Sequence, residues 1–268
     1  MSLYMPDKIT SVSNPRIRRL VELRKKAKLR RETGLFVIEG SRLCADTPEE
    51  FISEVYVTEE WIKNAPEKET AGFRNRPYTV VTEEVMAKAA DTATPQGILC
   101  VARMPSYSFE EMIKKKNPLF LVLEDLQDPG NLGTIFRTAE AAGASGILMS
   151  RTTVDLFNPK VVRATMSAVF RMPFVVRDDL CADLAVLRRA GVRSYAAHLA
   201  GKRAYDEIPL TSGCALLIGN EGNGLSEKLT EAADEKIIIP MKGGAESLNA
   251  AMAAGILLFE AARQRRHG

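Results

Sequence analysis

The second part of the chain alternates between short apolar runs and amphipathic segments. The apolar runs have the length of buried β-strands and lie at residues 119–124, 146–150, 193–199, 214–219 and 236–240. Segments with apolar positions at helical spacing lie between and after them, at residues 132–143, 158–170, 179–190, 225–233 and 247–265. Buried strands that alternate with helices form a sheet covered on both faces. The pattern therefore predicts an α/β domain with a mostly parallel sheet.

The first part of the chain is different. Its strand-like runs lie at residues 35–40, 54–58, 78–82 and 98–103, with helical pieces between them. The stretch 104–118 carries prolines near both ends and a run of lysines, as expected of a linker or a linking helix. The sequence thus predicts a small α/β domain over residues 1–104, a linker over 105–117 and a larger domain over 118–268.

One amphipathic helix with a heavily basic face is predicted near the N-terminus. Asn14 and Pro15 supply a cap and a first-turn proline, and Glu22 is the single acid in the stretch that follows. Its basic residues are Arg16, Arg18, Arg19, Arg24, Lys25, Lys26, Lys28, Arg30 and Arg31. Such a face is either solvated or binds phosphates. The whole chain has a net charge of only +3, so any basic field is local.

Composition excludes several other classes of protein. With 46% hydrophobic and 26% charged residues, the chain is globular. Its four cysteines are widely spaced and it has only two histidines, so no metal site is expected and the cysteines are expected to pack as small apolar residues. We expect no transmembrane helix and no signal peptide, and hence a cytoplasmic protein with reduced thiols.

Three polar loops with glycines each follow a predicted strand, at residues 125–137, 219–226 and 240–249. Loops at the carboxyl ends of parallel strands form the ligand crevice of such sheets, and glycine lets the backbone approach a ligand. The phosphate loop pattern G-x-x-x-x-G-K-[ST] and the dinucleotide pattern G-x-G-x-x-G are absent from the chain. These loops are still compatible with a small adenosine-containing ligand that is held by main-chain groups.

The charged residues of these loops allow two interpretations. Arg137 is either a surface residue or a contact to a phosphate or hydroxyl group. Glu221 and Glu246 are either solvated, capping or functional. His198 ends a predicted strand, where it either lines the crevice or packs.

The loops resemble a known family. DPGNLGTIFRTAEAAG, IGNEGNGLS and IPMKGGAESLNAAMAAGILLFEA are similar to the three motifs of SpoU-type (TrmH-type) RNA 2′-O-ribose methyltransferases of the SPOUT superfamily, over about residues 118–265. Residues 9–46, with a G-x-F-x-x-E-G stretch at 34–40, resemble the substrate-binding domain of many rRNA-modifying members. The resemblance implies a C-terminal trefoil knot, a ribosomal-protein-like RNA-binding domain before it, an S-adenosylmethionine (SAM) site and a homodimer.

The resemblance also implies roles for individual residues. Arg137 is the candidate for activating the 2′-hydroxyl group. The full catalytic set is Asn131, Arg137, Glu221, Ser247 and Asn249. The cofactor is expected against Ala197, Leu199, Gly219, Asn220, Ile239, Met241 and Leu248. Contacts to RNA are expected from Arg16, Arg18, Arg19, Arg24, Lys25, Lys28, Arg30 and Arg31.

The third motif departs slightly from the family, because Ala250-Ala251-Met252 stands where Val-Ser-Val is common. We expect changed packing and no loss of activity. The predicted substrate is large-subunit ribosomal RNA. A tRNA substrate and a non-catalytic RNA-binding or ribosome-assembly factor stay as alternatives.

Overall fold

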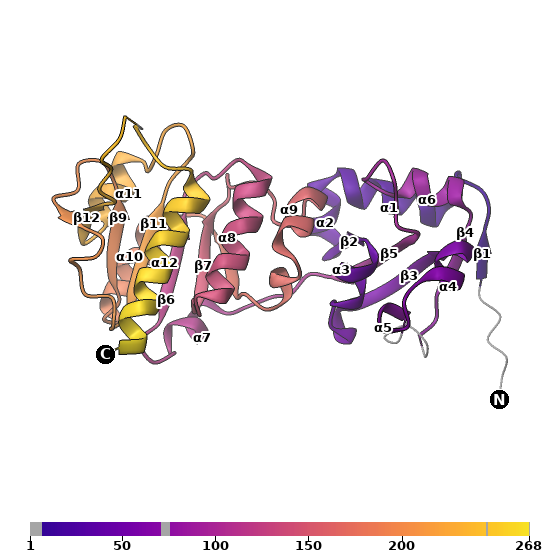
Figure 1. The fold of residues 1–268 in the computed structure, drawn as a ribbon, viewed down its shortest axis with the longest axis horizontal. Helices are drawn as coiled ribbons and strands as arrows, with labels where there is room; N and C mark the ends of the chain where they lie inside the picture. The colour runs from indigo at the N-terminus through magenta and orange to yellow at the C-terminus, as the bar shows by residue number, and fades with distance from the viewer. Residues whose placement is uncertain (1–6, 71–75, 245, 268) are drawn as a thin grey trace. The chain divides into compact units, whose positions relative to one another are not determined.

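The computed structural model describes residues 7–70, 76–244 and 246–267 and divides the chain into two compact units (Figure 1). The N-terminal unit comprises Met1–Pro105 together with Phe157–Phe170. The C-terminal unit comprises Ser106–Leu156 and Arg171–Gly268. Within the described residues, no helix has the length and apolar character needed to cross a membrane.

The C-terminal unit is built on a sheet in which every paired strand is parallel to its neighbour. The strand order is β10-β12-β9-β11-β6-β7-β8. The strands are β6 (Leu119–Leu123), β7 (Gly146–Ser150), β8 (Phe174–Arg177), β9 (Arg193–Ala197), β10 (Arg203–Ala204), β11 (Cys214–Ile218) and β12 (Glu235–Ile238). This confirms the predicted parallel sheet. The short strands β8 and β10 were not predicted.

Helices cover both faces of this sheet because its central strands are apolar on both sides. Phe120 and Val122 of β6 face a core that includes side chains of α7 (Phe109–Ile113), α10 (Leu180–Arg189) and α11 (Glu227–Ala232). The alternate β6 residue Leu121 is equally buried and points to the other face. Helices α8 (Pro129–Ala141) and α12 (Ala250–His267) contact each other, and α12 contacts β11.

The N-terminal unit has a mixed sheet in the order β1-β4-β3-β5-β2. The strands are β1 (Asp7–Ile9), β2 (Leu35–Glu39), β3 (Ile52–Thr58), β4 (Thr79–Val81) and β5 (Ile98–Arg103). The helices are α1 (Pro15–Lys25), α2 (Ala27–Thr33), α3 (Ser41–Ala45), α4 (Glu59–Asn64), α5 (Glu67–Thr70) and α6 (Glu83–Ala89), with a 3-10 turn at Glu49–Phe51. Apolar residues of α1 and α6 form a core against one face of the sheet.

Two predicted helices are each interrupted. The basic helix breaks at Lys26, whose extended backbone (φ −111°, ψ 103°) separates α1 from α2. The helix predicted over 158–170 ends after α9 (Pro159–Thr165), because Met166 and Ser167 both have left-handed backbone, and a 3-10 turn follows at Ala168–Phe170. Apolar periodicity runs through both breaks and so does not reveal them.

The compact units also differ from the predicted domain boundaries. The predicted linker 105–117 contains α7, whose Phe109 and Met112 are buried in the C-terminal core. Residues 157–170 were predicted within the larger domain, but they pack in the N-terminal unit. There the ring of Phe157 lies 4.8 Å from that of Phe36, measured between centroids. Burial of these aromatic rings explains why the segment joins that core.

Candidate functional site

A cavity of about 390 Å³ lies in the C-terminal unit, where the loops after β9, β11 and β12 meet the start of α12. All seven residues predicted to bind the cofactor line it: Ala197, Leu199, Gly219, Asn220, Ile239, Met241 and Leu248. Glu221 and Ser247 line it as well. Ala245, within the third predicted loop, lies outside the described residues. The crevice thus forms at the carboxyl ends of parallel strands, as the sequence predicts.

A polar network beside the cavity joins all three predicted loops. The Glu221 carboxylate accepts hydrogen bonds from the backbone amides of Gln127 and Asp128 and from Nδ2 of Asn131, each at 3.0 Å. Oδ1 of Asn131 in turn accepts from Nδ2 of Asn249 at 2.9 Å. Three residues that are far apart in the sequence therefore fix one another's orientation.

Hydrogen bonding keeps Glu221 ionised. Burial would raise the pKa of this carboxyl group, but the bonds from Asn131 and from the amides of Asp128 and Gln127 lower it below its usual value. Because donors already occupy both oxygens, Glu221 is suited to positioning Asn131 rather than to accepting a proton.

The same network fixes the beginnings of two helices. Asp128 caps α8 by accepting from the amide of Asn131 at 2.7 Å. Asn249 accepts from the amides of Ala251 and Met252 and so caps α12. Each cap satisfies amides that the helix leaves without partners. The site is therefore anchored to the two helices that contact each other.

Asp125 is a site residue for which the sequence predicts no role. Its backbone is left-handed (φ 56°), and its carbonyl oxygen accepts from Nδ2 of Asn220 at 2.8 Å. Its carboxylate accepts from the hydroxyl groups of Ser150 and Thr152. Asp125 therefore ties the first loop to the second. The sequence offered one indication, a carboxylate two residues beyond the buried strand β6.

Gly219 is required by a close approach of the backbone. The second loop folds back so that Asn220 and Gly224 exchange backbone hydrogen bonds. A Cβ atom on Gly219 would lie 2.1 Å from the carbonyl carbon of Gly224. No side chain fits there, so the loop lies against the cavity only with glycine.

Arg137 lies apart from the cavity within this chain. It is exposed, and its guanidinium makes no hydrogen bond or ion pair with any residue that the structure describes. Arg137 follows Asn131 by six residues on α8, which corresponds to about 9 Å along the axis and a different face of the helix. The structure thus brings together four of the five predicted catalytic residues around the cavity, and Arg137 is the exception.

His198 and Glu246 also line the cavity. Nδ1 of His198 accepts from the amide of Ala200 at 3.0 Å, which fixes the ring. Cys214 lies at the opposite end of β11, and burial raises the pKa of its thiol. That environment fits the expected packing role and not a thiolate nucleophile.

Several residues predicted to contact RNA form hydrogen bonds within the N-terminal unit. Arg16 donates to Asp7, Tyr56 and Thr79. Arg30 is only 3% exposed and donates to the carbonyl oxygens of Leu23 and Arg24 near the end of α1.

Arg24 donates to the carbonyl oxygen of Ala89 and so links α1 to α6. Of the residues predicted to contact RNA, those that stay exposed are Arg18, Arg19, Lys25, Lys28 and Arg31. Part of the basic pattern in the sequence therefore serves contacts within the N-terminal unit.

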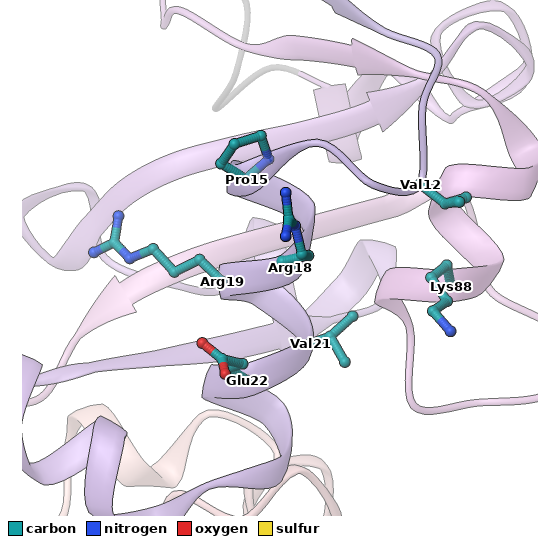
Figure 2. Close-up of a pocket in the computed structure, with 7 residues that line it drawn as sticks. All are labelled: Val12, Pro15, Arg18, Arg19, Val21, Glu22 and Lys88. Atoms are coloured by element: carbon teal, nitrogen blue, oxygen red, sulfur yellow. The ribbon is translucent and has the colours of Figure 1, made fainter.

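A basic groove of about 560 Å³ runs along α1. Arg18, Arg19 and Glu22 of α1 line it together with Lys88 of α6, which the sequence pattern did not single out. Figure 2 shows the two arginines extending from α1 and Lys88 from the neighbouring helix. Arg19 also contacts Glu54 at 3.2 Å. The groove offers three cations against one acid.

A parallel α/β unit with a cavity at its strand ends follows a small unit with a basic groove, an arrangement compatible with an enzyme that acts on nucleic acid. Two protein families identify the class more closely. Residues 118–259 match the SpoU rRNA Methylase family, and residues 14–100 match the MRM3-like substrate binding domain. The chain belongs to the SpoU rRNA methylase family.

Individual relatives match over nearly the whole chain. The 23S rRNA (guanosine(2553)-2′-O)-methyltransferase RlmP of Bacillus subtilis is 34% identical over 94% of this chain and 97% of its own length. An AdoMet-bound rRNA methyltransferase from Sinorhizobium meliloti is 34% identical with a TM-score of 0.83, over 97% of this chain and 98% of that chain. AviRb of Streptomyces viridochromogenes, in complex with the cofactor AdoMet, is 26% identical with a TM-score of 0.83, over 95% of this chain and 99% of that chain. These neighbours confirm the predicted SPOUT-type architecture.

Proposed function

We propose that this chain is a SAM-dependent 2′-O-ribose methyltransferase of large-subunit ribosomal RNA. The observation that carries the proposal is the network of Glu221, Asn131 and Asn249, which joins all three loops beside one cavity. Nearly full-length similarity to RlmP, named as a 23S rRNA 2′-O-methyltransferase, supports the substrate and the position of the methyl group. The 2′-hydroxyl group as acceptor requires RNA rather than DNA.

The cavity suits SAM in size and in surface. Its volume of about 390 Å³ lies within the range of small-molecule sites. Leu199 is 64% exposed and Leu248 is 38% exposed, and both line the cavity, so an adenine ring can cover apolar surface there. Bound in this cavity, SAM supplies the electrophilic methyl group.

The chain's own residues then orient the acceptor. Asn131, held by Glu221 and Asn249, presents its amide beside the cavity at the place proposed for the target ribose. The ribose oxygen forms a bond to the methyl carbon as the carbon–sulfur bond breaks, S-adenosylhomocysteine leaves, and the hydroxyl proton passes to solvent water. A cation near that oxygen lowers the barrier because it stabilises the developing negative charge. We assign that role to Arg137, since arginine stays protonated in proteins and is better suited to stabilising charge than to acting as a base.

This role for Arg137 requires a second copy of the chain. Arg137 is exposed and lies away from the cavity of its own chain, while Met252 (61% exposed) and Phe259 (52% exposed) present apolar surface on the neighbouring helix α12. We propose a homodimer that covers these side chains and brings Arg137 to the partner's cavity. Phe259→Asp places a charge on this surface and should yield a monomer in light scattering. A dimer that persists would contradict this interface.

The basic groove along α1 supplies affinity for RNA in this proposal. Arg18, Arg19 and Lys88 surround it, and Lys25 lies exposed on the same helix. Contacts to phosphates position RNA without reading its sequence and weaken as salt rises.

The proposal is tested with purified protein, methyl-labelled SAM and separate pools of unmodified rRNA and tRNA. The product is digested with alkali, which cannot cleave next to a 2′-O-methyl group. Label in alkali-resistant dinucleotides from rRNA is the expected result. Label only from tRNA would keep the chemistry and refute the substrate. Absence of both label and SAM binding would favour the non-catalytic RNA-binding factor.

A further inference from the structure

A separate cavity of about 300 Å³ lies within the N-terminal unit. Three segments enclose it: residues 39–46 after β2, residues 92–96 before β5, and residues 163–167 at the end of α9. The first segment contains the end of the G-x-F-x-x-E-G stretch. We call this space the α9 cavity.

Two buried polar groups at the α9 cavity have no partner among the described residues. Ser167 is 1% exposed, and its hydroxyl oxygen makes no hydrogen bond. Nη1 of Arg163 is likewise unpartnered, although Nη2 contacts Asp91 at 2.8 Å. Buried polar groups are nearly always hydrogen-bonded because leaving them unsatisfied is costly. Both residues line the α9 cavity, and a polar ligand there would supply the partner that each group lacks.

The neighbouring carboxylate of Glu39 forms no hydrogen bond with either of these two groups. Oε2 of Glu39 lies 3.9 Å from Nη1 of Arg163, which is beyond hydrogen-bond distance. Glu39 instead accepts from the amides of Asp91 and Thr92 and from the Thr92 hydroxyl group. Glu39 thus shapes the loop that forms one wall of the cavity and leaves Nη1 of Arg163 without a hydrogen bond to any residue that the structure describes.

The third wall is a strained turn. Met166 (φ 48°) and Ser167 (φ 69°) are consecutive non-glycine residues in left-handed conformation. Such a backbone is unfavourable for residues with a Cβ atom, and strain of this kind concentrates at functional sites. At this turn Ser167 is 1% exposed, whereas Met166 is 40% exposed and lines the cavity. A flexible thioether adapts well to the face of an aromatic ring.

The charges around the α9 cavity balance one another. Arg42 and Arg163 oppose Glu39 and Asp46 among its lining residues, and Arg42 contacts Asp46 at 3.8 Å. A cavity without net charge is poorly suited to a free anion. It suits a neutral ring that carries hydrogen-bond acceptors and has an apolar face.

We propose that the α9 cavity holds one unstacked base of the RNA substrate. The Ser167 hydroxyl and Nη1 of Arg163 contact its polar edge, and Met166 covers its face. Proteins read RNA in this way, by splaying single-stranded bases into pockets that combine stacking with hydrogen bonds. The inference rests on the proposed function, because it takes the RNA of that reaction as the ligand.

The first test compares two variants that each remove one unpartnered buried hydroxyl group. Ser167→Ala removes the group at the α9 cavity, and Thr230→Val removes a similar group on α11 in the C-terminal unit. Methyl transfer to unmodified 23S rRNA is measured with the full chain. We expect Ser167→Ala to raise the KM for rRNA about tenfold, the effect of one lost hydrogen bond, with kcat and SAM affinity unchanged. Thr230→Val should match the wild type.

The outcomes distinguish failure of the base-binding role from failure of the proposed function. Wild-type methylation of rRNA with equal KM values for both variants would overturn the base-binding role and keep the proposed function. A wild-type protein that methylates no rRNA would overturn both.

A second test follows access to the rim. Thr94 lines the α9 cavity and its exposed neighbour Ala93 does not. Thr94→Cys and Ala93→Cys therefore give matched thiols, and their alkylation is followed separately by peptide mass spectrometry. Unmodified 23S rRNA should slow alkylation at position 94 about tenfold more than at position 93. Equal protection would overturn the proposal, as would protection at 94 that grows with protein concentration in the absence of RNA, because the occupant would then be protein.

Discussion

Glu221→Gln tests the network at the candidate active site with a change of nearly constant shape. One carboxylate oxygen of Glu221 accepts from the amide of Gln127, and the other accepts from the amide of Asp128 and from Asn131. A glutamine amide has only one acceptor oxygen. Whichever way it turns, its NH₂ group meets a backbone donor, so at least one bond is lost and the remaining ones lose charge assistance.

The size of the effect follows from these bonds. A hydrogen bond to a charged group contributes about 1.5–3 kcal/mol, and the exposure of Glu221 favours the lower end of that range. If loss of the network misplaces Asn131 in the transition state, about 2 kcal/mol corresponds to a roughly 30-fold fall in kcat. The fold should persist, because the helices keep their own caps at Asp128 and Asn249.

The assay is single-turnover methyl transfer with labelled SAM and unmodified rRNA, together with denaturant unfolding. Glu246→Gln is the matched control, because Glu246 is an exposed carboxylate that lines the same cavity. Full activity in Glu221→Gln, or an equal loss in both variants, would refute the positioning argument.

The stability of the wild type and that of Glu221→Gln should also depend differently on pH. The pKa of Glu221 is lower in the folded state than in an unfolded chain, so its carboxylate stabilises the fold above the unfolded pKa of about 4.3. That contribution is lost as pH falls through the lowered folded pKa. The stability gap between wild type and Glu221→Gln should be constant near neutral pH and should close in acid. A gap that widens in acid would contradict the sign of the shift.

Three further variants test separate parts of the proposed function. Arg137→Ala should abolish methyl transfer and leave SAM binding nearly intact by calorimetry; equal loss of both would place Arg137 in the cofactor site or the fold. Gly219→Ala should weaken SAM binding more than tenfold, since the new Cβ meets backbone at 2.1 Å, and unchanged affinity would contradict the close approach. Lys25→Gln should reduce the slope of log affinity for rRNA against log salt by about 1 without changing thermal stability, and an unchanged slope would remove Lys25 from the RNA contacts.

The parallel sheet could be predicted from the sequence because its central strands are buried on both faces. Leu119–Leu123 and Cys214–Ile218 are continuous apolar runs, and each is followed by a polar loop with glycine. The short strands β8 and β10 carry no such pattern, since they lie at the edges of the sheet and are only partly buried. The knot, which the resemblance implies, stays a prediction, as does the expected cytoplasmic location.

The candidate site was only partly predictable for a different reason. Motif order located Asn131, Glu221 and Asn249, but only the structure shows that they bond to one another. Residue type alone could not separate Arg30, which is buried and bonds to the end of α1, from the exposed Lys25. Nor does a motif show which face of α8 carries Arg137, because a helix turns each residue by about 100°.

The chemistry itself demands a recognition element away from the reacting atoms. Every ribonucleotide carries a 2′-hydroxyl group, so a site that binds SAM and a ribose cannot choose one nucleotide among the thousands in ribosomal RNA. The basic groove cannot choose either, because phosphates are the same at every position. Selectivity must come from a surface that distinguishes bases or the folded shape of RNA. In the N-terminal unit, the α9 cavity combines unused buried hydrogen-bonding groups with balanced charge. That combination is what a base requires and a phosphate does not, and it argues that this unit contributes selectivity as well as affinity.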